Sequence, residues 1–235
     1  MSDRSDEVVV PVDWGDALDM AEEAATPPPP PVPNPSLAPV PPPLPPSPPP
    51  IPILAARETR DLVRGQRSKL ADLGLGTALE VVVQLAAPPG TVVDVTCLGL
   101  DAAGRLSDER YFVFYNQRRS PCDGVTLLDP APTGATGAFR FTLDALPAAV
   151  HRLVVAASFD GAGEMNALGP SEARWQDERG PVAAFAFTGH DFSAEKALMV
   201  LELYRKDGVW RTAALGQGFA GGLAALLGHF GAQAS

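Results

Sequence analysis

The segment ALMVLELYRKDGVWRTAALGQGFAGGL, at residues 197–223, decides the fold. Its two apolar runs, 197–204 and 210–215, are rich in β-branched and aromatic residues, which favour strands. The Asp207-Gly208 pair between them is a turn signal. After the second run we expect Gly216-Gln217-Gly218 to form a tight junction between strand and helix, because glycine permits a positive φ.

Upstream of this segment, strand-like runs alternate with breakers rich in Gly, Pro, Asp and Asn. The further candidate strands lie at 77–85, 91–100, 111–115, 139–143, 153–158 and 182–187. Many short strands with regular turn signals and no interleaved helices indicate a sandwich rather than a parallel α/β sheet. The sequence therefore predicts a mainly β protein, a two-sheet antiparallel β-sandwich.

A helix is predicted at the C-terminus. One apolar stripe at i, i+4, i+7, i+8 and i+11 is formed by Phe219, Leu223, Leu226, Leu227 and Phe230. This spacing is typical of an amphipathic helix that packs on a core. No Lys or Arg lies on its opposite face, so a membrane-surface role is not indicated.

The N-terminal part of the chain has a different composition. Residues 1–26 carry eight acids and one base, and 17 of the 26 prolines lie within 27–52. We expect an acidic disordered tail at 1–26, a proline-rich linker at 27–54 that favours polyproline II, and one domain at 55–235. The domain carries 20 acids and 17 bases, so most of the net charge of −10 belongs to the tail.

Several roles for this arm remain open. It could be a solvated tail without a binding role. Alternatively, protein partners could bind the arm through its apolar residues within 8–20. Either a strand at 8–12 would add to a partner's sheet, or a helix at 13–25 would lie in a groove. The proline-rich linker could also be a ligand for an aromatic-lined groove.

Composition excludes other classes of partner. The acidic balance leaves no basic stripe for nucleic acid. No run of 18 apolar residues is present to span a membrane, and the N-terminus lacks the pattern of a secretory signal. With only two cysteines, Cys97 and Cys122, disulfides are not the basis of the fold. We expect a cytoplasmic protein.

Four motifs together resemble the TerD family of tellurium-resistance and stress proteins. In chain order they are LVRGQRSKL at 62–70, YFVFYNQ at 111–117, LYR with GVW at 203–210, and ALGQGFAGGL at 214–223. Because all four lie in the order expected for the family, the chain is identified as a member over about residues 57–231. The resemblance implies a two-sheet β-sandwich, in agreement with the strand pattern.

The resemblance also implies a calcium site. TerD-type domains take ligands from an Asp-x-Asp strand, a Gly-Asp-Asn turn and an acidic loop. Here the strand keeps Asp94 but has Thr96 at the second position, the turn keeps only Asp129, and the loop at 131–138 has no acid. Asn116 remains as a carbonyl donor. Since affinity follows the number of carboxylates, we expect calcium binding through Asp94, Asn116 and Asp129 to be lost or weakened to about the millimolar range.

Other interpretations of these residues stay open. Asp94 could be an ordinary strand-end carboxylate, and Asp129 a turn former before proline. The alternative function is a calcium-responsive module that still binds Ca²⁺ through the three remaining ligands.

Catalytic motifs are not evident in the sequence. His151, His190 and His229 have no metal-ligand spacing, and neither cysteine has a nearby base in the sequence. We therefore expect a non-enzymatic binding or scaffold protein of the stress-response, tellurium-resistance type.

Overall fold

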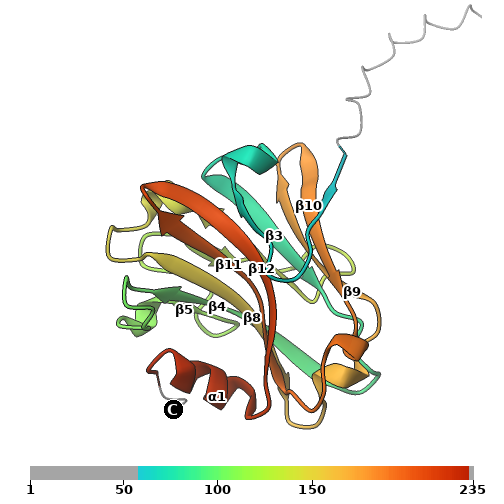
Figure 1. Ribbon diagram of the computed structural model, residues 1–235. Coiled ribbons are helices and arrows are strands. Elements are labelled where there is room, and N and C mark those ends of the chain that lie inside the picture. The colour runs from blue at the N-terminus through green and yellow to red at the C-terminus, as the bar shows by residue number, and fades with distance from the viewer. Residues whose placement is uncertain (1–57, 233–235) are drawn as a thin grey trace, which may run out of the picture. The chain divides into compact units, whose positions relative to one another are not determined.

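The computed structural model describes residues 58–232 (Figure 1). The expected acidic tail at 1–26 and proline-rich linker at 27–54 lie outside the described residues. Within residues 58–232, no helix combines the length and the apolar character needed to cross a membrane.

Two six-stranded sheets form the domain, as the strand pattern predicted. The first sheet has the order β1-β10-β9-β3-β7-β6. Its strands are β1 (Arg60–Asp61), β3 (Ala78–Gln84), β6 (Val125–Leu127), β7 (Gly137–Thr142), β9 (Ser171–Asp177) and β10 (Gly180–Phe187). All neighbours in it are antiparallel except β1 and β10, which run parallel.

The second sheet is antiparallel throughout and has the order β2-β12-β11-β8-β4-β5. Its strands are β2 (Arg67–Lys69), β4 (Val92–Leu100), β5 (Phe112–Val113), β8 (Arg152–Asp160), β11 (Ala197–Lys206) and β12 (Val209–Phe219). Short 3₁₀ helices in the connections are η1 (Ala71–Leu73), η2 (Glu109–Tyr111), η3 (Leu143–Ala145), η4 (Met165–Ala167) and η5 (Gly189–Asp191).

Side chains fill two layers. The main core lies between the sheets, where Val81, Phe139, Val155 and Trp175 are fully buried. A second apolar layer lies between the outer face of the second sheet and the helix α1 (Gly222–His229). The predicted C-terminal helix is thus confirmed, and it packs on the sheet through Leu223, Leu226 and Leu227 (Figure 1). The predicted stripe was too long, because Phe219 belongs to β12 and Phe230 follows the helix.

Alternation along β4 and β8 assigns each side chain to one of these layers. Val95 and Cys97 belong to the inter-sheet core, whereas Leu98 and Leu100 belong to the layer beneath α1. Because strand side chains alternate with period two, even-numbered residues of β4, including Asp94 and Thr96, face the side of α1. Val154 and Ala156 place the even-numbered residues of β8 on that same side.

The β11–β12 hairpin contains two glycines with a positive φ, Gly208 in its turn and Gly216 within β12. Its turn uses Asp207 and Gly208 with φ of 54° and 72°, the conformation that suits a two-residue hairpin loop. Farther on, Met199 pairs with Gln217 but Leu201 pairs with Ala214, so the ladder contains a bulge at Gly216, whose φ is 62°.

The expectation for Gly216-Gln217-Gly218 was therefore wrong in one respect. Gly216 does have a positive φ, but the segment lies inside β12, which continues to Phe219. The helix begins at Gly222, also at positive φ. The physical reason is that a bulge lets a strand absorb an extra residue and continue pairing.

One hydrogen bond crosses the inter-sheet core. The indole N–H of Trp175, on β9, donates to Oγ1 of Thr212, on β12, over 2.9 Å, and that hydroxyl donates to the carbonyl of Glu202 over 2.9 Å. Both side chains are fully buried. The bond thus fixes the position of one sheet relative to the other.

Candidate functional site

Asp94 and Asp129 line one small recess, of about 170 Å³. Asp94 is in the first half of β4, and Asp129 follows β6 in a loop that begins with a cis Asp129–Pro130 bond. Thr136 and Gly137 close the recess from the start of β7. The structure therefore brings together two of the three residues predicted from the sequence as calcium ligands. We call this site the Asp129 recess.

An arginine occupies the recess with them. Nη1 of Arg118 lies 2.5 Å from a carboxylate oxygen of Asp129, and Nε of Arg118 donates to the carbonyl of Tyr115 over 3.2 Å. About half of each of the two paired side chains is exposed, at 54% and 53%. The carboxylate that the sequence offers as a calcium ligand thus already has a guanidinium partner.

Asn116, the third predicted ligand, is exposed and does not line the recess. It belongs to a tight turn that is closed by two backbone hydrogen bonds of 3.0 Å between Phe114 and Gln117. Gln117 reinforces this turn, because its side-chain amide donates to the carbonyls of Glu109 and Phe112 over 2.9 and 2.7 Å.

The electrostatic surroundings of Asp94 include a carboxylate that the sequence gave no reason to select. Partial burial raises the pKa of Asp94, and the negative charge of Asp160 raises it further. Asp160 ends β8 opposite Val92, and Asp94 lies opposite Ser158, so the two acids are diagonal neighbours on one face. Only the strand register reveals this proximity.

Thr96, the neutral residue at the second position of the expected Asp-x-Asp pair, lies on the same face as Asp94. It is only 3% exposed, and its hydroxyl oxygen has no hydrogen-bond partner among residues 58–232. Within that range, no group of three or more His, Cys, Asp or Glu side chains has the spacing to hold a metal ion.

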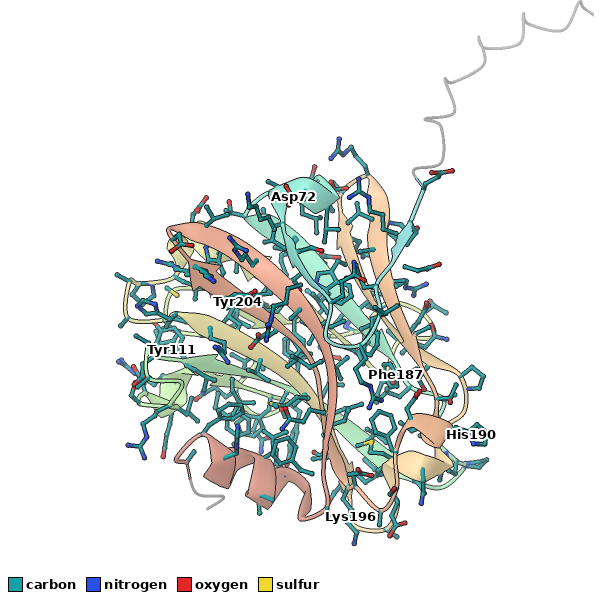
Figure 2. All side chains as sticks on the ribbon, in the orientation of Figure 1. Asp72, Tyr111, Phe187, His190, Lys196 and Tyr204 are labelled. Carbon is teal, nitrogen blue, oxygen red and sulfur yellow. The ribbon has the colours of Figure 1, made fainter. Side chains whose placement is uncertain are left out.

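Groups that could act as nucleophiles or bases are dispersed. Cys97 is in the inter-sheet core, where burial strongly raises the pKa of its thiol, so it stays neutral. Cys122 is half-buried, and its sulfur accepts from the hydroxyl of Tyr111 over 3.9 Å. His190 and His229 are exposed at separate places, and His190 lies in η5 at the periphery of the domain (Figure 2).

These features define a β-sandwich domain with one C-terminal helix, and with the Asp129 recess between β4 and the loop that follows β6. The chain belongs to the TerD domain family, whose model matches residues 59–230.

Its relatives include resistance and stress proteins. It is 30% identical over 153 residues to the tellurium resistance protein TerD of Serratia marcescens, covering 61% of this chain and 79% of that one. It is 29% identical over 150 residues to general stress protein 16U of Bacillus subtilis, covering 60% and 78%.

A solved structure has the same fold. The homologue of telluride resistance protein from Streptomyces coelicolor superposes with a TM-score of 0.51 at 16% identity, over 64% of this chain and 95% of that one.

Proposed function

We propose that this chain is a non-enzymatic TerD-domain stress protein that acts as a binding or scaffold module, and that its calcium binding is weak or lost. The observation that carries the proposal is the ion pair between Arg118 and Asp129 within the recess. Two free cysteines suit the reducing cytoplasm that we propose as its location.

Charge counting supports weak calcium binding. Ca²⁺ takes six to eight oxygen ligands, and its affinity rises with the number of carboxylates. Of the recess residues, only Asp94 and Asp129 carry carboxylates, and Ca²⁺ would have to displace a guanidinium from Asp129. Arg118 supplies the positive charge that the cation would otherwise supply.

Calorimetric titration of the full chain with Ca²⁺ tests this proposal. We expect no saturable heat below about 1 mM Ca²⁺. Arg118→Gln should tighten binding about 3- to 10-fold, because it frees Asp129 and removes a like charge. Arg110→Gln is the matched control, since Arg110 pairs with Asp108, which does not line the recess. Micromolar binding by the natural chain would overturn the proposal.

A calcium-responsive module is the second candidate, and it is favoured by the shared recess of Asp94 and Asp129. The same titration discriminates between the two functions. The responsive module requires binding that Asp129→Asn weakens and a rise in melting temperature with Ca²⁺.

The scaffold role requires protein partners, which we propose bind within residues 8–20 or to the proline-rich linker. Affinity capture with the full chain and with a chain beginning at Ala55 compares the two partner sets. Loss of specific partners from the shorter chain is the expected result. Identical sets would contradict the role of the arm, and a reproducible hydrolytic activity in a substrate screen would contradict the non-enzymatic assignment.

A further inference from the structure

A second and larger cavity, of about 480 Å³, lies beside the Asp129 recess. It is bounded by β4, by the segment from η2 through β5, and by α1. Asp94 and Tyr115 line both sites, whereas Asp129 and Arg118 line only the recess. The size is within the range of small-molecule sites, about 300–1,000 Å³. We call it the acidic pocket.

Three carboxylates line this pocket: Asp94, Glu109 and Asp160. No Lys, Arg or His is among its lining residues, and within residues 58–232 none of the three acids takes part in an ion pair. Other acids of the domain do have arginine partners, as Glu80 has Arg140 and Asp129 has Arg118. The pocket therefore holds uncompensated negative charge.

Thr96 gives independent evidence of a missing partner. Its side chain lines the pocket and is 3% exposed, and its hydroxyl oxygen has no hydrogen-bond partner. Buried hydroxyls are nearly always satisfied, because leaving one without a partner costs free energy. After a rotation of the Thr96 side chain toward the pocket, an N–H donor held beside Asp94 would satisfy it.

Aromatic rings form the wall next to these groups. Phe112 and Phe114 stack with ring centroids 4.8 Å apart, and Tyr115 packs edge-on against Phe114 at 5.4 Å. Tyr115 is 58% exposed although it is a large side chain. Ring faces attract cations through their quadrupole. Leu223 and Leu227 of α1 add an apolar side.

We propose that the acidic pocket binds a primary alkylammonium group. The carboxylates attract the positive charge of the ammonium group, and the Thr96 hydroxyl accepts a hydrogen bond from one of the ammonium N–H groups. The aromatic and leucine side chains contact the alkyl chain of the ligand. A quaternary ammonium lacks the N–H donors. Ca²⁺ prefers a shell of oxygen ligands, which the apolar walls do not supply. The proposal does not require calcium in the neighbouring recess, although the two sites share Asp94.

The ammonium could be carried by a free diamine or by a lysine side chain of a partner protein. The first 26 residues of this chain do not suit the pocket, because they carry eight acids and Arg4 as their one base. Like charges would repel them from it. The ligand therefore comes from another molecule.

Calorimetry on the full chain, with pentane-1,5-diamine and Nα-acetyl-lysine-N-methylamide as probes, tests the proposal. Pentan-1-ol and tetramethylammonium are the control ligands, and both should bind at least about tenfold more weakly. Tighter binding of the diamine would indicate a free polyamine as the natural ligand. Tighter binding of the lysine derivative would indicate a lysine side chain of a partner protein.

Three variants locate the binding. Asp160→Asn, at an exposed strand end, should weaken ammonium binding about tenfold. Thr96→Val, which keeps the β-branched shape, should weaken it severalfold. Asp123→Asn is the matched control, because Asp123 pairs with Arg119, lines neither the recess nor the acidic pocket, and should leave ammonium affinity unchanged. Equal melting temperatures would establish that each variant is folded.

The proposal is overturned if neither amine binds saturably at about 10 mM, or if pentan-1-ol binds as well as the diamine. It is equally overturned if Asp160→Asn has no effect, or if Asp123→Asn weakens amine binding as much as Asp160→Asn does. These outcomes are separate from those of the calcium titration, in which Asp129 rather than Asp160 is the sensitive position.

Discussion

The hydrogen bond from Trp175 to Thr212 joins two sheets across a core that is formed mainly by apolar side chains. Replacing Thr212 with Val keeps the shape but leaves the indole N–H buried without an acceptor. We expect the free energy of unfolding to fall by about 1–3 kcal/mol, the cost of an unsatisfied buried donor. Urea denaturation followed by tryptophan fluorescence measures it.

A double-mutant cycle provides the control for this prediction. Trp175→Phe removes the donor, so adding Thr212→Val should then cost about 1 kcal/mol less than it does alone. Strictly additive losses would show that the hydrogen bond does not contribute. The hydroxyl of Thr212 also donates to Glu202, so a small residual cost is expected even in the double variant.

The family motifs in the sequence led to two predicted calcium ligands that share a recess in the structure, and calcium binding by them stays a prediction. Asp94 and Asp129 were both selected from the sequence, and they do line one recess. Asn116 was placed with them, yet it points out from a tight turn. Arg118 and Asp160 carried no motif. Arg118 approaches Asp129 because of a loop conformation, and Asp160 approaches Asp94 because of the β4–β8 register. A single sequence specifies neither of these.

At the scale of elements, apolar strands were predictable and mixed strands were not. The eight predicted strands correspond to β3, β4, β5, β7, β8, β10, β11 and β12, and α1 was also predicted. β9 was missed although it is central in its sheet. Its buried residues Ser171, Ala173 and Trp175 alternate with the half-buried Glu172 and Arg174. The alternation of buried and half-buried residues therefore indicates a strand, whereas the amino-acid composition does not.

Short edge strands were missed for another reason. β1, β2 and β6 have two or three residues each. β1 and β2 pair with β10 and β12, which are distant in the sequence, and β6 pairs with β7 across a loop. So few residues carry no periodicity of their own. Tertiary pairing determines these strands, which explains why local patterns did not reveal them.

The bulge in β12 provides a prediction at this scale. In Gly216→Ala, a non-glycine residue would adopt a φ of 62°, and its Cβ would lie 2.8 Å from Nε of Arg64 and 3.2 Å from the Phe185 ring. We expect a loss of about 1–3 kcal/mol in stability. Gly76→Ala is the control, since Gly76 has no positive φ and open space around it, and it should be neutral or slightly stabilising. Equal melting temperatures for the two variants would contradict the strain at Gly216.

At the scale of the whole molecule, charge is distributed unevenly. The first 26 residues carry eight acids and one base, and the chain from Ala55 onward carries 20 acids and 17 bases. Among residues 58–232, ion pairs join arginines to eight of the 20 acids, and the three acids of the acidic pocket are among those without such a pair. The acidic segment adds to the net negative charge with which the chain attracts cations.

This charge distribution predicts a salt-dependent contribution of the acidic segment. Changing its eight acids to the corresponding amides in the full chain removes the charge and keeps the length. At about 10 mM ionic strength, where the Debye length is about 30 Å, the natural chain should bind pentane-1,5-diamine severalfold more tightly than this variant. At about 150 mM salt the difference should nearly vanish, because the Debye length falls to about 8 Å, while the effect of Asp160→Asn should remain. A difference that persists at high salt would mean that the segment contacts the ligand directly, and no difference at either salt concentration would exclude long-range attraction.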